Sequence, residues 1–244
     1  MRQLTPYLFL LLVASFLYSC KSAKLSDAEE KQRIGEYFEA AAIYRKVYTK
    51  TPPAKRDLRG YIAFRMAECN RLINNTPRAT SAYMNALRYK YPDSIVNLRL
   101  GQMYQKSGRY GEAIKYYNDY LLAEPGSVLA FNGVAGCEEA VKWKQAPTRY
   151  TVRRMEKFNS RRSEFSPMLY GEKYDQLYFA SSRTPKGAGK DKEETNSAIT
   201  GQRNNDFFLV KQDETGAWQA PVELEDEVNT EFDEGTPSFS KDGN

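Results

Sequence analysis

The sequence has no histidine among its 244 residues. Histidine is the commonest general base and the commonest metal ligand in proteins. Its absence excludes Ser-His-Asp and Cys-His catalysis and the ordinary zinc enzymes. A carboxylate-based enzyme stays open as an alternative. We nevertheless expect a chain that is not an enzyme and that holds no metal and no cofactor.

The chain also lacks concentrated basic charge and has few cysteines. Its net charge of +5 is spread without a long basic block, unlike the clustered charge of a nucleic-acid interface, so we expect no nucleic-acid partner. Apart from Cys20, the cysteines are Cys69 and Cys137, whose spacing fits no metal or redox motif. In the repeat register below they occupy the same position of two repeats that are not adjacent. They should then be too far apart for a disulfide and act as small buried apolar residues.

The longest stretch that is nearly all apolar, from Tyr7 to Leu17, is too short for a membrane-spanning helix, which needs about 20 apolar residues. With Arg2 in front of it, the run has the form of an export signal. The segment ends in Leu17-Tyr18-Ser19-Cys20, which resembles the lipobox of bacterial lipoproteins, although Tyr18 is bulkier than the usual residue. We expect a signal peptide over 1–19, an acylated Cys20 and a tether over 20–25. An ordinary signal peptide with an incidental cysteine is the alternative.

The first half of the chain contains an internal repeat. Glycine, alanine, tyrosine and proline fall at identical offsets in two segments, one with Gly35, Ala40, Tyr44 and Pro52 and the other with Gly108, Ala113, Tyr117 and Pro125. Ala79, Tyr83 and Ala86 lie between them, with Pro92 one residue late. The glycine allows a tight turn between two helices, the alanine lets them cross closely, and the proline ends the second helix.

This pattern resembles the tetratricopeptide repeat, whose period is 34 residues. Ala79 and Ala113 are 34 residues apart, whereas Ala40 and Ala79 are 39 apart, so we place an insertion in the first linker, around 51–57. An unrelated helical bundle is the alternative. We expect a repeat domain over 26–146, made of three repeats and a closing helix. Such arrays curve, and the first helix of each repeat lines the inner surface.

The register places eight side chains in the expected protein-binding groove. These are Tyr61, Phe64, Glu68, Arg71, Leu98, Gln102, Gln105 and Asn132. Phe64 and Arg71 are the expected anchors, because aromatic residues and arginine dominate binding energy at interfaces. The alternative for each position is that its side chain only packs between repeats.

From Pro147 onward the sequence changes to alternating β-formers with Gly, Asn and Asp turns, which indicates strands. Phe165-Ser166-Pro167, expected to form a turn that leads into a strand ending in Ser181-Ser182-Arg183, resembles the TolB-like propeller repeat, and 237–244 open the same pattern again. Further strands are expected at 206–210 and 218–222, with a loop insertion at about 184–204. We expect 147–244 to be the start of a β-propeller, truncated because a propeller needs about four blades. The fold class is therefore α + β multidomain, with an all-α tetratricopeptide-repeat superhelix followed by an incomplete propeller.

The order of lipobox, tetratricopeptide repeats and TolB-like repeat resembles the PorE-type periplasmic lipoproteins of type IX secretion and gliding systems. The peptidase-regulatory-like and OmpA-type domains of that family do not appear in this sequence, so peptidoglycan binding is not carried over. The resemblance implies an outer-membrane lipoprotein that faces the periplasm, is held by its N-terminal lipid and scaffolds envelope or secretion-system proteins. The alternatives are a general OmpA-family envelope or peptidoglycan tether and, from another class, an accessory enzyme acting on carbohydrate or peptide.

Overall fold

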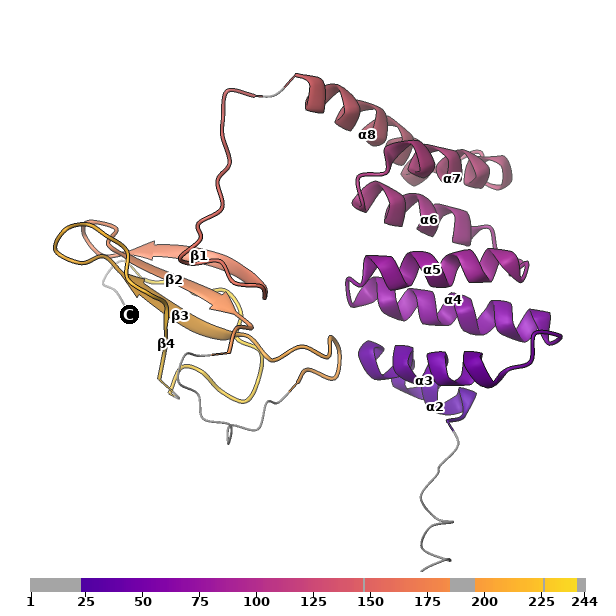
Figure 1. The fold of residues 1–244 in the computed structure, drawn as a ribbon, viewed down its shortest axis with the longest axis horizontal. Coiled ribbons are helices and arrows are strands. Elements are labelled where there is room, and N and C mark those ends of the chain that lie inside the picture. Colours follow the sequence, from indigo (N-terminus) through magenta and orange to yellow (C-terminus); the bar gives the residue numbers. More distant parts are fainter. Residues whose placement is uncertain (1–22, 147, 185–195, 226, 241–244) are drawn as a thin grey trace, which may run out of the picture. The chain divides into compact units, whose positions relative to one another are not determined.

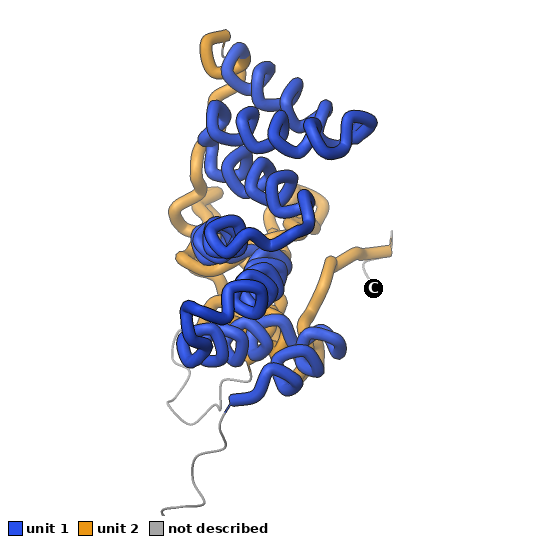
Figure 2. Tube along the Cα trace, turned by 90° about the vertical axis from the view of Figure 1, so that its right-hand side faces the viewer, with its two compact units in different colours: residues 1–142 blue, residues 143–244 orange. Residues whose placement is uncertain are grey.

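The computed structural model describes residues 23–146, 148–184, 196–225 and 227–240. The chain divides into two compact units, Met1–Lys142 and Trp143–Asn244 (Figures 1 and 2). The predicted signal peptide, the predicted acylation site Cys20 and most of the predicted loop insertion lie outside the described residues.

The described part of the first unit consists of seven helices that follow one another as antiparallel hairpins (Figure 1). They are α2 (Leu25–Arg33), α3 (Tyr37–Lys50), α4 (Arg56–Leu72), α5 (Thr76–Arg88), α6 (Ile95–Lys106), α7 (Tyr110–Ala123) and α8 (Val128–Gln145). We call α2, α4, α6 and α8 the first-helix layer, and α3, α5 and α7 the second-helix layer. This arrangement confirms the predicted tetratricopeptide-like array of helices.

A residue with positive φ closes each of the three hairpins. Gly35 has φ +88°, Asn74 has φ +62° and Gly108 has φ +72°. Glycine adopts this left-handed conformation readily, and asparagine is one of the few other residues that tolerates it. The second repeat therefore keeps the turn geometry although it lacks the glycine.

One tyrosine of each second helix fills the interior of its hairpin. Tyr44, Tyr83 and Tyr117 are buried, and Tyr117 lies against two glycines of the first-helix layer. Gly101 and Gly133 show the tightest fit, since a Cβ on either one would lie 2.6 Å or 2.5 Å from the ring of Tyr117. The packing of this ring thus depends on glycine in α6 and in α8.

The insertion in the first linker was placed wrongly, because most of the extra residues lengthen α4. This helix has 17 residues and α6 has 12, while the connections before the two helices are of similar length. Arg59 in the added turn lies 4.1 Å from the ring centroid of Tyr48 and 5.0 Å from that of Tyr89. Cation–π attraction and the packing of Gly60 against Tyr89 and Tyr91 stabilise this extra turn.

Cys69 and Cys137 are free and buried, as predicted. Burial raises the pKa of the Cys69 thiol to about 12 and also raises that of Cys137. Desolvation penalises the thiolate, so both residues act as apolar core groups.

The second unit contains a four-stranded antiparallel sheet. Its strands, β1 (Glu164–Tyr170), β2 (Gln176–Ser181), β3 (Asp206–Lys211) and β4 (Val222–Glu223), are ordered as in the sequence. A propeller blade is also a four-stranded sheet, but one sheet does not establish a propeller, so the propeller remains a prediction.

Each face of the sheet carries aromatic side chains. Phe158, Phe179, Phe208 and Val210 form a small buried cluster against which Leu177 and Trp218 pack. Phe239, which comes after the strands, stacks on Tyr170 at 4.5 Å between ring centroids and lies 4.7 Å from Tyr178. The strands thus alternate their side chains between two apolar faces.

Two local predictions for this unit were wrong. Phe165-Ser166-Pro167 is not a turn before a strand but part of β1, where Ser166 has φ +52° and the register with β2 shifts. The strand expected at 218–222 is reduced to the short β4 and to an isolated bridge between Gln212 and Trp218. The strand expected at 206–210 is present as β3.

Candidate functional site

All eight predicted groove residues lie in the first-helix layer. Tyr61, Phe64, Glu68 and Arg71 are on α4, Leu98, Gln102 and Gln105 are on α6, and Asn132 is on α8. Successive helices of the layer are in contact: the Tyr61 hydroxyl donates a hydrogen bond of 2.8 Å to Glu29 of α2, and an ion pair joins α4 to α6. The structure therefore brings these residues onto neighbouring helices.

The expected aromatic anchor, Phe64, is engaged inside the array. Its ring stacks on Tyr91 with 4.5 Å between centroids and an interplanar angle of 12°, and it lies 6.1 Å from Tyr83. Stacked aromatic pairs are worth about 0.5–1.5 kcal/mol beyond their buried area. Phe64 thus contributes mainly to packing between the second and third repeats.

Glu68 and Arg71, also predicted to contact a ligand, form an internal charged cluster. Arg71 donates to Glu68 at 2.7 Å, Arg99 of α6 lies 3.2 Å from the same carboxylate, and the Tyr83 hydroxyl donates to it. Burial by itself would raise the pKa of Glu68, but the hydrogen bonds from Arg71 and Tyr83 and the neighbouring guanidinium charges outweigh it and lower that pKa. The cluster holds the second and third repeats together.

The remaining groove residues differ in accessibility. Leu98 was wrongly placed in the groove, since only 4 % of it is exposed and it belongs to the core. Gln105 accepts a hydrogen bond of 2.6 Å from the Tyr117 hydroxyl, and Gln102 accepts one of 3.1 Å from Arg99. Asn132 is exposed. The first-helix layer therefore presents a mostly polar surface whose side chains also join the repeats.

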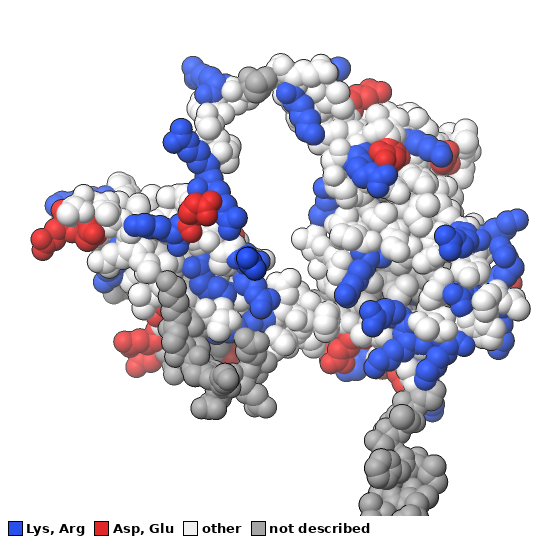
Figure 3. Space-filling model, viewed as in Figure 1, with Lys and Arg blue, Asp and Glu red and all other residues white. Residues whose placement is uncertain are grey.

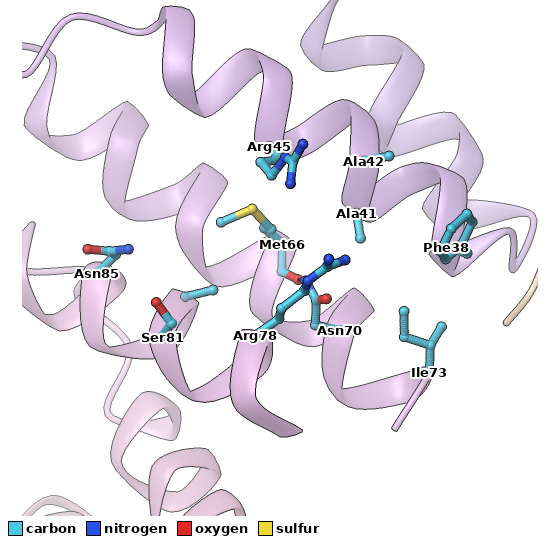
Figure 4. A pocket seen from close by; sticks show the side chains of 11 residues that line it. Phe38, Ala41, Ala42, Arg45, Met66, Asn70, Ile73, Arg78, Ser81 and Asn85 are labelled. Carbon is cyan, nitrogen blue, oxygen red and sulfur yellow. Dashed lines mark hydrogen bonds between the residues drawn. The ribbon is translucent and has the colours of Figure 1, made fainter. Parts of the chain in front are cut away.

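The structure adds a pocket that sequence reasoning missed, formed mainly by residues of the second-helix layer (Figure 4). It has a volume of about 450 Å³ and lies among α3, α4 and α5. It is lined by Phe38, Ala41, Ala42, Arg45, Met66, Asn70, Ile73, Arg78, Ser81, Ala82 and Asn85. We call it the second-layer pocket.

The second-layer pocket has an apolar floor and a basic rim. Met66 and Asn70 of α4 lie between Arg45 of α3 and Arg78 of α5, and Phe38 lies toward one end (Figure 4). Asn70 is buried, and its side-chain amide donates to the Met66 carbonyl at 2.8 Å. The lining includes no acidic residue. The signal that sequence reasoning overlooked is the pair of arginines on second helices.

Elsewhere in the described part of the chain, no three cysteine, aspartate or glutamate side chains converge in a way that would hold a metal ion. Within the same residues, none of the helices has the length and apolar character needed to cross a bilayer.

Comparison with known proteins identifies one repeat directly. The family model of the tetratricopeptide repeat matches residues 96–127, which run from α6 through α7 to the residue before α8. The predicted repeat type is thereby confirmed for this hairpin. None of the curated proteins compared with the chain matches it.

Several solved structures resemble part of the chain. MamA is 17% identical, with a TM-score of 0.44, over 50% of this chain and 68% of MamA. The first repeat domain of Spaghetti (RPAP3), solved with an HSP90 peptide, is 19% identical with a TM-score of 0.43, over 51% of this chain and 98% of that domain. The Sgt2 domain from Aspergillus fumigatus is 16% identical with a TM-score of 0.42, over 56% and 89%. With TM-scores below 0.5, these likenesses add no argument about function.

Proposed function

We propose that this chain is a non-enzymatic scaffold that binds other proteins through its helical repeats. The observation that carries the proposal is the stack of tetratricopeptide-like hairpins, held by a tyrosine in each second helix and matched at 96–127 by the repeat family. Each repeat contacts its neighbours and leaves a long continuous surface on either side, which suits polypeptide ligands.

The finer part of the proposal is the setting of this scaffold. We place it at the periplasmic face of the outer membrane, anchored through acylated Cys20 and working with envelope proteins of a type IX secretion or gliding machine. Its support is the order of sequence features: a lipobox-like segment, the repeats and a TolB-like segment. Globomycin treatment with radiolabelled palmitate tests the anchor, because an unlabelled protein of unchanged migration would contradict acylation at Cys20.

Site-specific photo-crosslinking in the native cell tests protein binding by the first-helix layer. A photoreactive phenylalanine analogue would replace Gln102 or Asn132, and the matched control would place it at Lys115, an exposed residue of α7 in the other layer. We expect crosslinks to a discrete envelope protein from the first two positions and not from the control. Equal crosslinking from all three, or none from Gln102 and Asn132, would refute binding at this surface.

A further inference from the structure

We propose that the second-layer pocket binds an acidic peptide segment, which inserts one apolar side chain over Met66 and pairs its carboxylates with Arg45 and Arg78. The proposal rests on the protein-binding role given above, but it concerns a different site, formed mainly by the second-helix layer, and names the chemistry of the ligand. Four features of the described residues support it.

The first feature is the state of the two arginines. Within the described residues neither Arg45 nor Arg78 forms an ion pair, whereas Arg33, Arg71 and Arg109 each pair with a glutamate of their own helix region. Both residues are exposed at the rim of the pocket. Guanidinium groups with free donors bind carboxylates well, often through two parallel hydrogen bonds.

The second feature is the shape and polarity of the space between them. Ligand pockets typically have about 300–1,000 Å³, and this one has about 450 Å³. Phe38 remains 41% exposed at its edge, and Ala41, Ala42 and Met66 line it. An apolar side chain placed here would cover exposed apolar surface, which is favourable by the hydrophobic effect.

The third feature is the net charge of the segment whose helices form the pocket. Residues 37–90 contain eleven Lys and Arg but only three Asp and Glu, so this segment carries +8 whereas the whole chain carries +5. Basic side chains lie over α3, α4 and α5 (Figure 3). Such a surface attracts acidic partners and orients them before contact.

The fourth feature is that the combination does not recur in the next repeat. The positions equivalent to Arg45 and Arg78 are Met84 and Glu112, and Glu112 is itself paired with Arg109. The basic rim is therefore a property of this one junction and not of the repeat pattern. A recessed site with two arginines favours a peptide over an anionic membrane, which would need only a basic surface.

Fluorescence anisotropy with the purified full chain tests the proposal. The probe is the labelled peptide Asp-Glu-Asp-Phe-Glu-Asp-Glu, compared with one that has serine in place of phenylalanine and one that has asparagine and glutamine in place of the acids. We expect the first peptide to bind at least about tenfold more tightly than either control, and its affinity to fall with added salt.

Matched variants locate the site. Arg45→Gln with Arg78→Gln should weaken binding about tenfold, because it removes both rim charges. Lys46→Gln with Arg88→Gln removes the same charge from the same two helices outside the pocket and should change affinity less than about twofold. Ser81→Phe, which fills the pocket without changing charge, should also abolish most binding. Circular dichroism would verify that each variant is folded.

Several results would overturn the proposal. Equal losses in both double variants would mean attraction to the general basic surface, and equal binding of the phenylalanine and serine peptides would exclude the apolar anchor. Binding of phosphatidylglycerol vesicles that depends on Arg45 and Arg78, without peptide binding, would assign the site to a membrane. Crosslinking from Gln102 is independent of these measurements, so failure of the pocket and failure of the scaffold role can be told apart.

Discussion

Adding one methyl group at Gly133 should destabilise the helical unit, although alanine is the better helix former. A Cβ at this position would lie 2.5 Å from Cζ of Tyr117, 2.6 Å from its Cε2 and 2.8 Å from its Cε1. Favourable carbon–carbon contacts are about 3.5–4.0 Å, so the overlap is about 1 Å. The methyl group thus requires the ring or the helix to move.

The ring of Tyr117 has little freedom to move. It is 2% exposed, its other side lies against Gly101 of α6, and its hydroxyl donates a hydrogen bond of 2.6 Å to Gln105. Overpacking of a tight core costs about 1–3 kcal/mol, and the upper part of that range applies here. Helix propensity returns about 1 kcal/mol, which leaves a net loss of about 1–2 kcal/mol.

Urea unfolding followed by circular dichroism at 222 nm measures this loss, because the helical unit provides most of that signal. The matched control is Gly111→Ala in α7, where no atom lies within 4 Å of the added Cβ. This change should stabilise the unit by about 0.5 kcal/mol. In a background with Tyr117→Leu, Gly133→Ala should become neutral or stabilising, giving a coupling energy of about 1 kcal/mol or more. A Gly133→Ala variant as stable as the parent, or one whose effect is unchanged with leucine at 117, would contradict a clash with the Tyr117 ring.

Three further predictions concern charged and thiol groups. Glu68→Gln leaves two half-buried guanidinium groups without their carboxylate and should cost about 2 kcal/mol in urea titrations at pH 7. Because the pKa of Glu68 is lowered below 4.5, this stabilisation is present above pH 4.5 and lost as the pH falls further, so the deficit should shrink in acid. Burial, with the adjacent Glu223, raises the pKa of Asp206 from 3.8 to about 6. Protonated Asp206 therefore stabilises the folded sheet fully below pH 3.8, and this stabilisation is lost as the pH rises through 6. In amide hydrogen exchange, the protection free energy of the β2 and β3 amides should therefore fall by about 2–3 kcal/mol between pH 3.8 and 6, and it should not fall in Asp206→Asn. A protection free energy that does not change with pH in the parent chain would contradict this. Cys69 and Cys137 should resist iodoacetamide in the native chain and react in urea, as peptide mass spectrometry would show. Labelling of Cys69 or Cys137 in the native chain would disprove their burial.

The helical unit could be predicted well from sequence because its rules are local and repeated. Gly35 and Gly108 mark turns that need positive φ, and alanine recurs where helices cross. Asn74 takes the same turn conformation, which the 34- and 39-residue spacings identify even without glycine. What the spacing could not decide was where the extra residues go. The 39-residue spacing led us to place them in the linker around 51–57, yet Arg59 between two tyrosines makes an added helical turn favourable.

The sheet unit was less predictable because its strands depart from simple alternation. A positive φ at Ser166 produces a register shift inside β1, so a Ser-Pro pair that usually indicates a turn lies within a strand. β4 has only two residues, although the sequence from Trp218 has strand character. There the indole packs against Phe158 at 5.4 Å between centroids, a contact that pairing rules do not reveal.

Binding residues were harder to predict from the sequence than the helices that carry them. Periodicity assigns a side chain to a face of a helix, but it does not say whether another side chain already occupies that face. Phe64 meets Tyr91, and Glu68 meets Arg99, so two of the strongest groove candidates are engaged within the array. Tyr91 lies in the connection before α6, and Arg99 lies on α6 itself. The spacing of residues within α4 alone cannot reveal contacts with either of them.

The second-layer pocket differs from these groove candidates, because Arg45 and Arg78 at its rim form no ion pair within the described residues. The repeat pattern fixes only the small and aromatic residues between helices and leaves the outer positions of α3 and α5 free to vary. Arg45 and Arg78 occupy such positions, and the next repeat has Met84 and Glu112 in their place. Because the repeat fold does not require either arginine, their placement around one apolar recess has no evident role in packing. The binding specificity of this array should therefore be sought where its sequence departs from the repeat.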